Sequence, residues 1–378
     1  MPNVIDLYAG AGGLSLGASR AGFTVAVAVE IDSHAIKTHK NNFPNTIHLQ
    51  KDIRNISVED IEKASGISKT DVIGVIGGPP CQGFSSIGQG DVEDERNKLF
   101  KRFFEIVRDI QPTFFVAENV PGIMRDKYNK IRAEALSIVT RDYYILNPII
   151  VNASDYGAAT TRTRYFFIGL RNNSGIKLCN EDFEKVKVQI TQKTNVQAAL
   201  EGLPSNLHFA KEQTGLCVLE KSYTDRRRKH LQSASFYAKM TGEIPPGVGN
   251  PIFIKQYKKY HITNGFLMTN HTEIVAHRYQ ALRCGEQDKT SKSYKLKPES
   301  FCPTLRAGTG PDKGSFQAVR PIHFTEPRVI NPREAARLQG FPDWFELPNT
   351  IWHSFRQIGN SVSPIAAEAV LKVIFDHL

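Results

Sequence analysis

The stretch VIDLYAGAGGLSLGASRAGFTVAVAVE, residues 4–30, contains the pattern that decides the fold. An apolar run ends in a glycine-rich turn, a helical pattern follows, and a second apolar run ends in Glu30. A strand, a tight turn and a helix in this order let the backbone approach a ligand at the helix N-terminus. The turn departs from the dinucleotide pattern G-x-G-x-x-G, because Ser15 stands where the third glycine belongs. The stretch therefore predicts the start of an open α/β sheet with a ligand at its edge.

Short apolar runs and helical patterns alternate through residues 1–185, which is typical of such a sheet. Leu, Phe, Ile and Val residues recur at helical spacing over 99–110 and predict an amphipathic helix. Two more helices should begin at Asn331-Pro332 and Ser363-Pro364, where an N-cap residue precedes proline. We expect a doubly wound, mostly parallel, Rossmann-like sheet with strands at 4–8, 24–30, 46–49, 72–77, 113–118, 144–151 and 165–170.

Polar side chains follow the second and third predicted strands. Glu30 and Asp32 end the second run, and an acidic group there can accept hydrogen bonds from a ribose diol. The third run leads into Asp52-Ile53, a polar and apolar pair suited to the edge and face of adenine. Because the dinucleotide fingerprint is incomplete and no second nucleotide-binding half is visible, an adenosyl cofactor is favoured over a nicotinamide dinucleotide.

Three further strand ends carry reactive side chains. The fourth run ends in Gly-Gly-Pro-Pro-Cys-Gln, which brings Cys81 to the ligand-binding edge of the sheet. A lone cysteine is more often a small buried hydrophobe, but two prolines fix the backbone here. Glu118 ends the fifth run, so a carboxyl group for proton transfer is expected beside the thiol. Arg162 and Arg164 lie on one face of an entering strand, either as edge charges or as an anion clamp.

The excess of positive charge lies in one part of the chain. The 378 residues include 48 Lys and Arg against 38 Asp and Glu. Residues 186–335 hold 23 of the basic and 12 of the acidic residues, whereas the rest of the chain is nearly neutral. Such a block, interleaved with glycine, proline and aromatic residues, favours a polyanion-binding surface over a basic membrane helix.

The composition excludes several classes of protein. With 40% hydrophobic and 23% charged residues the chain is neither disordered nor collagen-like, and its length fits about two domains. No apolar run reaches the roughly 18–20 residues of a membrane span, and the N-terminus lacks the basic start of a secretory signal. The five cysteines are scattered without a C-x-x-C pair, so we expect no disulfide framework, no metal site and a cytoplasmic location.

A series of motifs along the whole chain resembles those of the bacterial DNA (cytosine-5)-methyltransferases of restriction–modification systems. They are Asp6…Gly10-x-Gly12-Gly13, Glu30-x-Asp32, Asp52-Ile53, Pro79-Pro80-Cys81-Gln82, Glu118-Asn119-Val120, Arg162-x-Arg164, Arg333-Glu334-x-x-Arg337-x-Gln339-Gly340-Phe341-Pro342 and Gly359-Asn360-Ser361-Val362. One departure stands before the arginine pair, where Ala159-Thr160 replace the family's usual Pro-Gln.

The resemblance implies methyl transfer from S-adenosylmethionine to C5 of a flipped-out cytosine in a specific double-stranded DNA sequence, through a covalent Cys81–C6 intermediate. Glu118, Arg162 and Arg164 would be the other catalytic residues. The resemblance assigns the cofactor to Tyr8, Gly10, Gly12, Leu14, Glu30, Ile31, Asp52, Ile53, Pro80, Leu99, Asn360, Ser361 and Val362. Contacts with DNA are expected from Gln82, Ser85, Arg226, Arg227, Arg228, Lys258 and Lys259.

The resemblance also implies a division of the chain. A catalytic domain, 1–185, would be completed by 345–378 and joined through a hinge, 336–344, to a smaller target-recognition domain, 186–335. We expect a monomer on nucleoid DNA in the cytoplasm, with no membrane contact and no required protein partner; a cognate restriction endonuclease is compatible with this. An RNA (cytosine-5)-methyltransferase of the same fold, a DNA-binding homologue without catalysis and a nicotinamide oxidoreductase remain alternatives.

Overall fold

The computed structural model describes residues 1–80, 97–189, 193–205, 215–219, 234–308 and 319–378. Within these ranges eight strands form one sheet in the order β3-β2-β1-β4-β5-β8-β6, with β7 also paired to β8. Strands β1 to β5 are parallel, and β8 runs antiparallel to β5, β6 and β7. Their bounds are β1 Asn3–Leu7, β2 Thr24–Val29, β3 Ile47–Leu49, β4 Val72–Gly77, β5 Phe114–Asn119, β6 Tyr143–Ile145, β7 Ile149–Asn152 and β8 Thr163–Arg171. The predicted mostly parallel sheet is confirmed.

One predicted strand is wrong in its extent. The run 144–151 is two strands, β6 and β7, which pair with different parts of β8. Pro148 lies between them and has no N–H to give to a sheet ladder. The interruption lets the chain leave β8 after Ile145 and return to it at Ile149.

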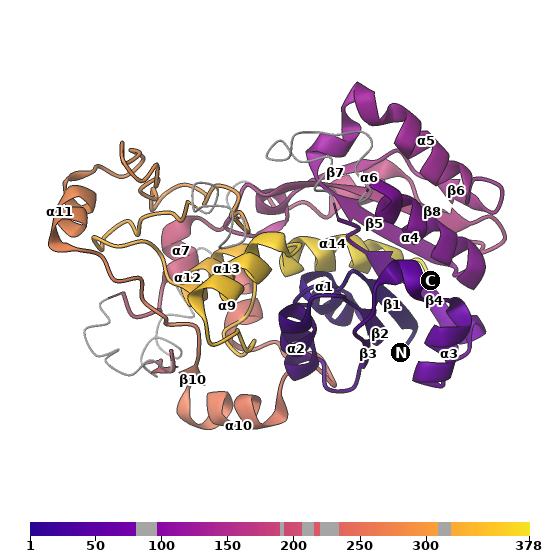
Figure 1. Ribbon diagram of the computed structural model, residues 1–378, viewed down its shortest axis with the longest axis horizontal. Coiled ribbons are helices and arrows are strands. Elements are labelled where there is room, and N and C mark those ends of the chain that lie inside the picture. The colour runs from indigo at the N-terminus through magenta and orange to yellow at the C-terminus, as the bar shows by residue number, and fades with distance from the viewer. Residues whose placement is uncertain (81–96, 190–192, 206–214, 220–233, 309–318) are drawn as a thin grey trace.

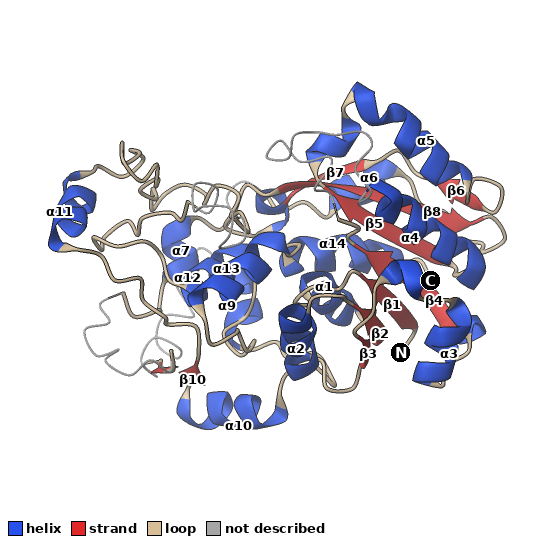
Figure 2. Cartoon of the chain, in the orientation of Figure 1, coloured by secondary structure: helices blue, strands red, loops and turns tan. Residues whose placement is uncertain are grey.

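Helices cover both faces of the sheet, as Figures 1 and 2 show. Alternate strand residues point to opposite faces, so Val4 packs in the core on one side and its neighbour Ile5 in the core on the other. The first core contains α1 (Gly13–Ala21) and α14 (Pro364–Phe375), and the second contains α3 (Val58–Ser65), α4 (Asn97–Ile110) and α5 (Asn129–Ser137). The amphipathic pattern predicted over 99–110 is α4, and the doubly wound architecture is confirmed.

The contact between α1 and α14 is unusually close. A methyl group built on Gly17 would lie 2.4 Å from Cβ of Ala367 and 2.7 Å from the amide nitrogen of Glu368. The C-terminal helix therefore packs against the first helix of the sheet without room for a further carbon atom. Together α13 (Ile351–Asn360) and α14 are long and apolar enough to cross a membrane, but 72% of their apolar 18-residue window is buried in the protein, as in a core helix.

The remaining described α-helices and strands extend from α2 at the sheet to α11, which lies far from it (Figure 1). They are α2 Ser33–Asn42, α6 Asn180–Lys185, α7 Val196–Leu200, α9 Ala234–Thr241, α10 Pro251–Tyr260, α11 Glu273–Ala281, α12 Pro332–Gln339 and the strand pair β9 Cys217–Val218 and β10 Ile262–Thr263. The two predicted helix starts are confirmed. Asn331 caps α12 in a reciprocal box with Glu334, and Ser363 precedes Pro364 at the start of α14.

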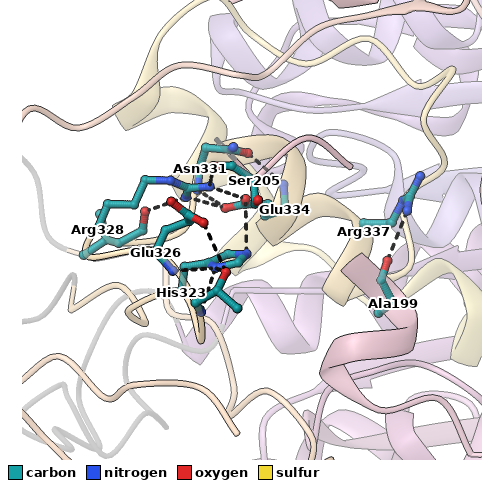
Figure 3. Close-up of polar contacts among 10 residues, drawn as sticks. Ala199, Ser205, His323, Glu326, Arg328, Asn331, Glu334 and Arg337 are labelled. Carbon is teal, nitrogen blue, oxygen red and sulfur yellow. Dashed lines mark hydrogen bonds and ion pairs between the residues drawn. The ribbon is translucent and has the colours of Figure 1, made fainter. Parts of the chain in front are cut away.

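Buried charges join α12 to distant parts of the chain (Figure 3). Arg328 donates to both carboxylate oxygens of Glu334, at 2.7 and 2.9 Å, and also to the carbonyl of Ser205. His323 Nδ1 accepts the amide of Thr325, so its proton lies on Nε2, which faces Glu334 at 3.7 Å. On another side of the helix, Arg337 donates to the carbonyl of Ala199.

Candidate active site

A cavity of about 370 Å³ opens at the carboxyl ends of the parallel strands. Its size lies in the range of small-molecule sites, and it forms where the strand order reverses between β1 and β4. Twelve of the thirteen residues assigned to the cofactor line it, from six separate parts of the chain: Tyr8, Gly10, Leu14, Glu30, Ile31, Asp52, Ile53, Pro80, Leu99, Asn360, Ser361 and Val362.

Gly12 is the assigned cofactor residue that does not line the cavity. It has a φ of +100°, and a methyl group on it would lie 2.3 Å from the ring of Phe43. Glycine is needed here for the left-handed backbone and for close packing against α2. The structure thus gives Gly12 a role in shaping the turn.

Glu30 is held rigidly at the cavity wall. One carboxylate oxygen accepts the amide of Gly10 at 2.9 Å, and the other accepts the amide of Asp32 at 2.8 Å. Burial raises the pKa of Glu30, and the hydrogen bonds from both amides oppose that rise. Ile31 lies beside it with 61% of its surface exposed, so an apolar face is presented to a ligand.

Asp52 stands on the other side of the cavity in a different electrostatic environment. Its carboxylate accepts the Arg54 amide and forms an ion pair with the Arg54 guanidinium. These hydrogen bonds lower the pKa of Asp52. Ile53, the next residue, is buried against the same cavity.

Glu118 and the two arginines meet at the deep end of the cavity. Arg164 Nε lies 2.8 Å from Oε1 of Glu118, across the antiparallel pair of β5 and β8. Glu118 is buried, and this desolvation raises its pKa although Arg164 and Arg162 pull in the opposite direction. A carboxyl group with a raised pKa keeps its proton to a higher pH than usual, which suits it to donate that proton to a base.

Arg162 is positioned by a segment distant in sequence. Its guanidinium donates to the carbonyl of Leu305 at 3.2 Å. The main chain before it is bridged to Cys302, whose amide donates to the Ala159 carbonyl at 2.9 Å. The same segment, residues 302–307, faces α13, because a methyl group on Gly359 would lie 2.4 Å from the amide nitrogen of Ala307. We call residues 302–307 the inner segment. Ala159 and Thr160, which replace the family's usual Pro-Gln, are buried beside it.

Several predicted residues cannot be placed. Cys81, Gln82, Ser85 and Arg226 to Arg228 lie outside the described residues. The main chain leading to Cys81 is described: Pro79 and Pro80 line the cavity, and the carbonyl of Pro79 accepts the side-chain amide of Asn119 at 3.3 Å. Lys258 and Lys259 are exposed in the last turn of α10.

Several residues of the cavity wall were not among the predicted site residues. They include Asp6, at the end of β1, and His353, Arg356 and Gln357 on α13. An acidic residue inside a buried strand was a signal for Asp6. The α13 residues had no comparable signal, because their approach to the cavity depends on long-range packing.

Comparison with known proteins gives a consistent result. A family model described as C-5 cytosine-specific DNA methylase matches residues 2–376. The chain is 36% identical over 371 residues to the type II methyltransferase M.XorII of Xanthomonas oryzae pv. oryzae, with 98% of this chain and 83% of that protein covered. It is 31% identical to M.DdeI of Desulfomicrobium norvegicum, over 98% and 88% of the two chains.

Among solved structures, a putative DNA modification methyltransferase from an Escherichia coli prophage has a TM-score of 0.85 and 47% identity, covering 100% of this chain and 99% of its own. The Dnmt2 methyltransferase of S. pombe shares the fold, with a TM-score of 0.62 and 18% identity over 100% and 98% of the chains.

Proposed function

Since the chain belongs to the family of C-5 cytosine-specific DNA methylases, it is a DNA cytosine-5-methyltransferase, and we propose that Cys81, Glu118, Arg162 and Arg164 are its catalytic residues. The observation that carries this assignment is the meeting of Glu118 with both arginines in the cavity that Pro79 and Pro80 also line. These prolines immediately precede Cys81.

The proposed chemistry starts with the thiolate, because C5 of cytosine is too weak a nucleophile to take a methyl group directly. The Cys81 thiolate forms a bond to C6, and the electron pair of the C5–C6 double bond becomes available at C5 while the ring gains negative charge. Glu118 donates a proton to N3 and neutralises that charge. Its raised pKa supports this role.

The arginines complete the pocket in this proposal. Arg164 orients the Glu118 carboxyl group through the 2.8 Å contact, and Arg162, buried beside it, offers a guanidinium to O2 of the base. After C5 has gained the methyl group, a base removes the C5 proton. The C5–C6 double bond then forms again, the thiolate leaves, and N3 returns its proton to Glu118.

The cavity suits S-adenosylmethionine, which would supply the methyl group on a sulfonium. Glu30, fixed by two amides, would hold the ribose hydroxyls, and Ile31 and Ile53 would contact the adenine face. Oδ1 of Asp6 is buried at the cavity and accepts no hydrogen bond from any described residue. A buried acceptor of this kind fits a ligand that brings N–H donors or positive charge.

We propose the division of the chain that the motifs imply. The eight-stranded sheet lies within 1–185, and α14, which packs against it, lies within 345–378. The basic block, 186–335, would bind double-stranded DNA and select the target. A cytosine inside a duplex is out of reach, so it must rotate into the pocket. The type II relatives support a modification enzyme of a restriction–modification system. We propose that it acts as a monomer on DNA in the cytoplasm.

A mechanism-based adduct tests the assignment. Duplex DNA with 5-fluorocytosine at the target position stalls the last step, because fluorine cannot leave C5 as a cation. With S-adenosylmethionine, we expect a denaturation-resistant adduct that maps to Cys81 by peptide mass and is absent from Cys81→Ala. Burial raises the pKa of the Cys302 thiol to about 12, so this cysteine is a poor competitor. An adduct on another cysteine, or none on DNA that is methylated when unfluorinated, would contradict the mechanism.

A further inference from the structure

An ion pair at the wall of the cofactor cavity joins two elements far apart in the sequence. Asp32 stands at the N-cap of α2, and Arg356 lies on α13; Nη1 of Arg356 is 3.0 Å from Oδ2 of Asp32. The other carboxylate oxygen of Asp32 accepts the amides of His34 and Ala35, at 2.9 and 3.0 Å. The cap therefore fixes the direction in which Oδ2 points.

A ring contact lies next to the ion pair and joins the same two helices. The imidazoles of His34 and His353 are stacked, with centroids 3.7 Å apart and planes 24° from parallel. Trp352 packs edge-on against His353, with centroids 4.7 Å apart, and the Arg356 guanidinium lies 5.1 Å from the centre of the Trp352 ring. One turn of α13 is thus attached to the start of α2 by two kinds of contact.

These residues belong to the wall of the cavity. Asp32, His353 and Arg356 line it, next to Ile31 and on the same helix as Asn360. The main chain of Asp32 also donates to Glu30, so one residue contacts both the proposed ribose ligand and Arg356.

We propose that Asp32, His34, His353 and Arg356 form a latch that holds α13 against α2 and retains the cofactor in the cavity. The proposal rests on the proposed cofactor site. The ion pair is partly exposed, with 27% of the Asp32 and 40% of the Arg356 side chain accessible. An ion pair this exposed is weak, so it can open in every catalytic cycle. An enzyme that exchanges a spent cofactor for a new one must open its site in each turnover, and a weak contact permits this. Asp32 and Arg356 are positioning residues in this account.

The test compares dissociation of S-adenosylmethionine and S-adenosylhomocysteine from wild type, Asp32→Asn and Arg356→Gln. Asparagine keeps the N-cap of α2 and removes the charge, so the helix start is preserved. We expect each variant to release both cofactors about 2- to 5-fold faster, which is the size of an exposed ion pair. The double variant should release the cofactors no faster than either single variant, because each single substitution already removes the same ion pair.

Two readouts separate a latch from a general loss of structure. Dissociation can be followed by the fluorescence of Trp352, one of two tryptophans in the chain, and the signal should vanish in Trp352→Phe. The wild-type rate should approach that of the variants at high salt, where the pair is screened. Lys372→Gln, which breaks the exposed pair with Asp376 on α14, is the matched control and should behave as wild type.

The outcomes distinguish this proposal from the proposed function. Unchanged dissociation rates in both variants would overturn the latch, as would a lower kcat at saturating cofactor with an unchanged KM for cofactor. Failure of the wild-type protein to bind either cofactor would instead remove the proposed cofactor site itself.

Discussion

Glu118 is subject to two opposing influences at the edge of the sheet. Burial favours its neutral form, and the guanidinium of Arg164 at 2.8 Å favours its charged form. The balance leaves its pKa raised, which is the direction that proton donation to a base requires.

The first prediction follows from that proton. Glu118→Gln keeps the shape of the side chain and an oxygen that can accept from Arg164, but its amide cannot transfer a proton to the base. We expect kcat to fall by about 10²- to 10⁴-fold, while S-adenosylmethionine still binds. Single-turnover methylation and equilibrium cofactor binding would measure the two effects. Turnover near the wild-type value would exclude Glu118 from the mechanism.

Asp6 lies at the end of a directed chain of hydrogen bonds. Ser15 donates to Asp6 at 2.5 Å, and His39 Nε2 lies 2.9 Å from Ser15 Oγ, so this nitrogen must donate. His39 Nδ1 then accepts from His48 Nε2 at 2.9 Å. Burial raises the pKa of Asp6 from 3.8 to about 7, which means that the folded protein binds this proton more tightly than the unfolded chain.

The second prediction is a pH dependence of stability. The contribution of Asp6 is fully present below about pH 4 and is lost as the pH rises through its folded pKa of about 7. At most roughly 4 kcal/mol of unfolding free energy is lost in this way. The Asp6→Asn variant has no carboxyl group to titrate at this position, so it does not lose this contribution. We expect the unfolding free energy of the variant, relative to wild type, to increase from pH 5 to pH 8 in urea titrations. Parallel pH profiles of the two proteins would contradict the prediction.

At the scale of the element, the contact of α1 with α14 makes a distinctive prediction. Propensity alone says that Gly17→Ala should stabilise α1 by about 1 kcal/mol. The short distances to Ala367 and Glu368 predict the opposite, because overpacking costs about 1–3 kcal/mol. Urea unfolding should show a net loss of stability that Ala367→Gly recovers in part. A stabilised Gly17→Ala variant would show that the two helices separate easily.

Elements with strong local signals could be predicted from the sequence. The capping residues Asn331, Pro332 and Glu334 act over a few residues, and α12 begins where they predict. The division of β6 from β7 was missed although Pro148 signalled it, since the apolar run continued on both sides. The sequence predicts Gly12 in the ligand-binding turn, but its contact with Phe43 depends on how α2 packs and has no signal in the sequence.

At the scale of the molecule, the grouping of residues at the strand ends could be predicted from the sequence. The residues that contact them from distant parts of the chain could not. A parallel sheet brings its carboxyl ends to one edge, so Glu30, Asp52 and Glu118 could be placed together from their order alone. No pattern in the nearby sequence predicts the contact of Leu305 with Arg162 or that of Arg356 with Asp32. Each depends on how more than a hundred intervening residues pack.

The distribution of charge gives a prediction for the whole molecule. If Lys258 and Lys259 on α10 bind phosphates, replacing both by Gln should weaken binding to all DNA sequences. The slope of the logarithm of the binding constant against the logarithm of the salt concentration should then become shallower. We expect a change of roughly one unit for each phosphate that the variant no longer neutralises. Filter binding or fluorescence anisotropy across a salt series would measure it. Lys130→Gln on α5, an exposed lysine outside the basic block, is the control. An unchanged slope would show that α10 lies away from the duplex.

If residues 186–335 select the target, as we propose, the inner segment limits how freely target specificity can be exchanged between relatives. A chimera that takes residues 186–335 from another enzyme also imports the carbonyl that holds Arg162 and the main chain that faces Gly359. The graft would then alter the reaction rate together with the choice of target. The reason is that the inner segment belongs to the grafted region but contacts the proposed catalytic domain. A splice that leaves residues 302–307 with the host separates the two properties. During evolution, residues 302–307 would change together with the catalytic residues that they contact. The loops around this segment would be free to diverge and to recognise new DNA sequences.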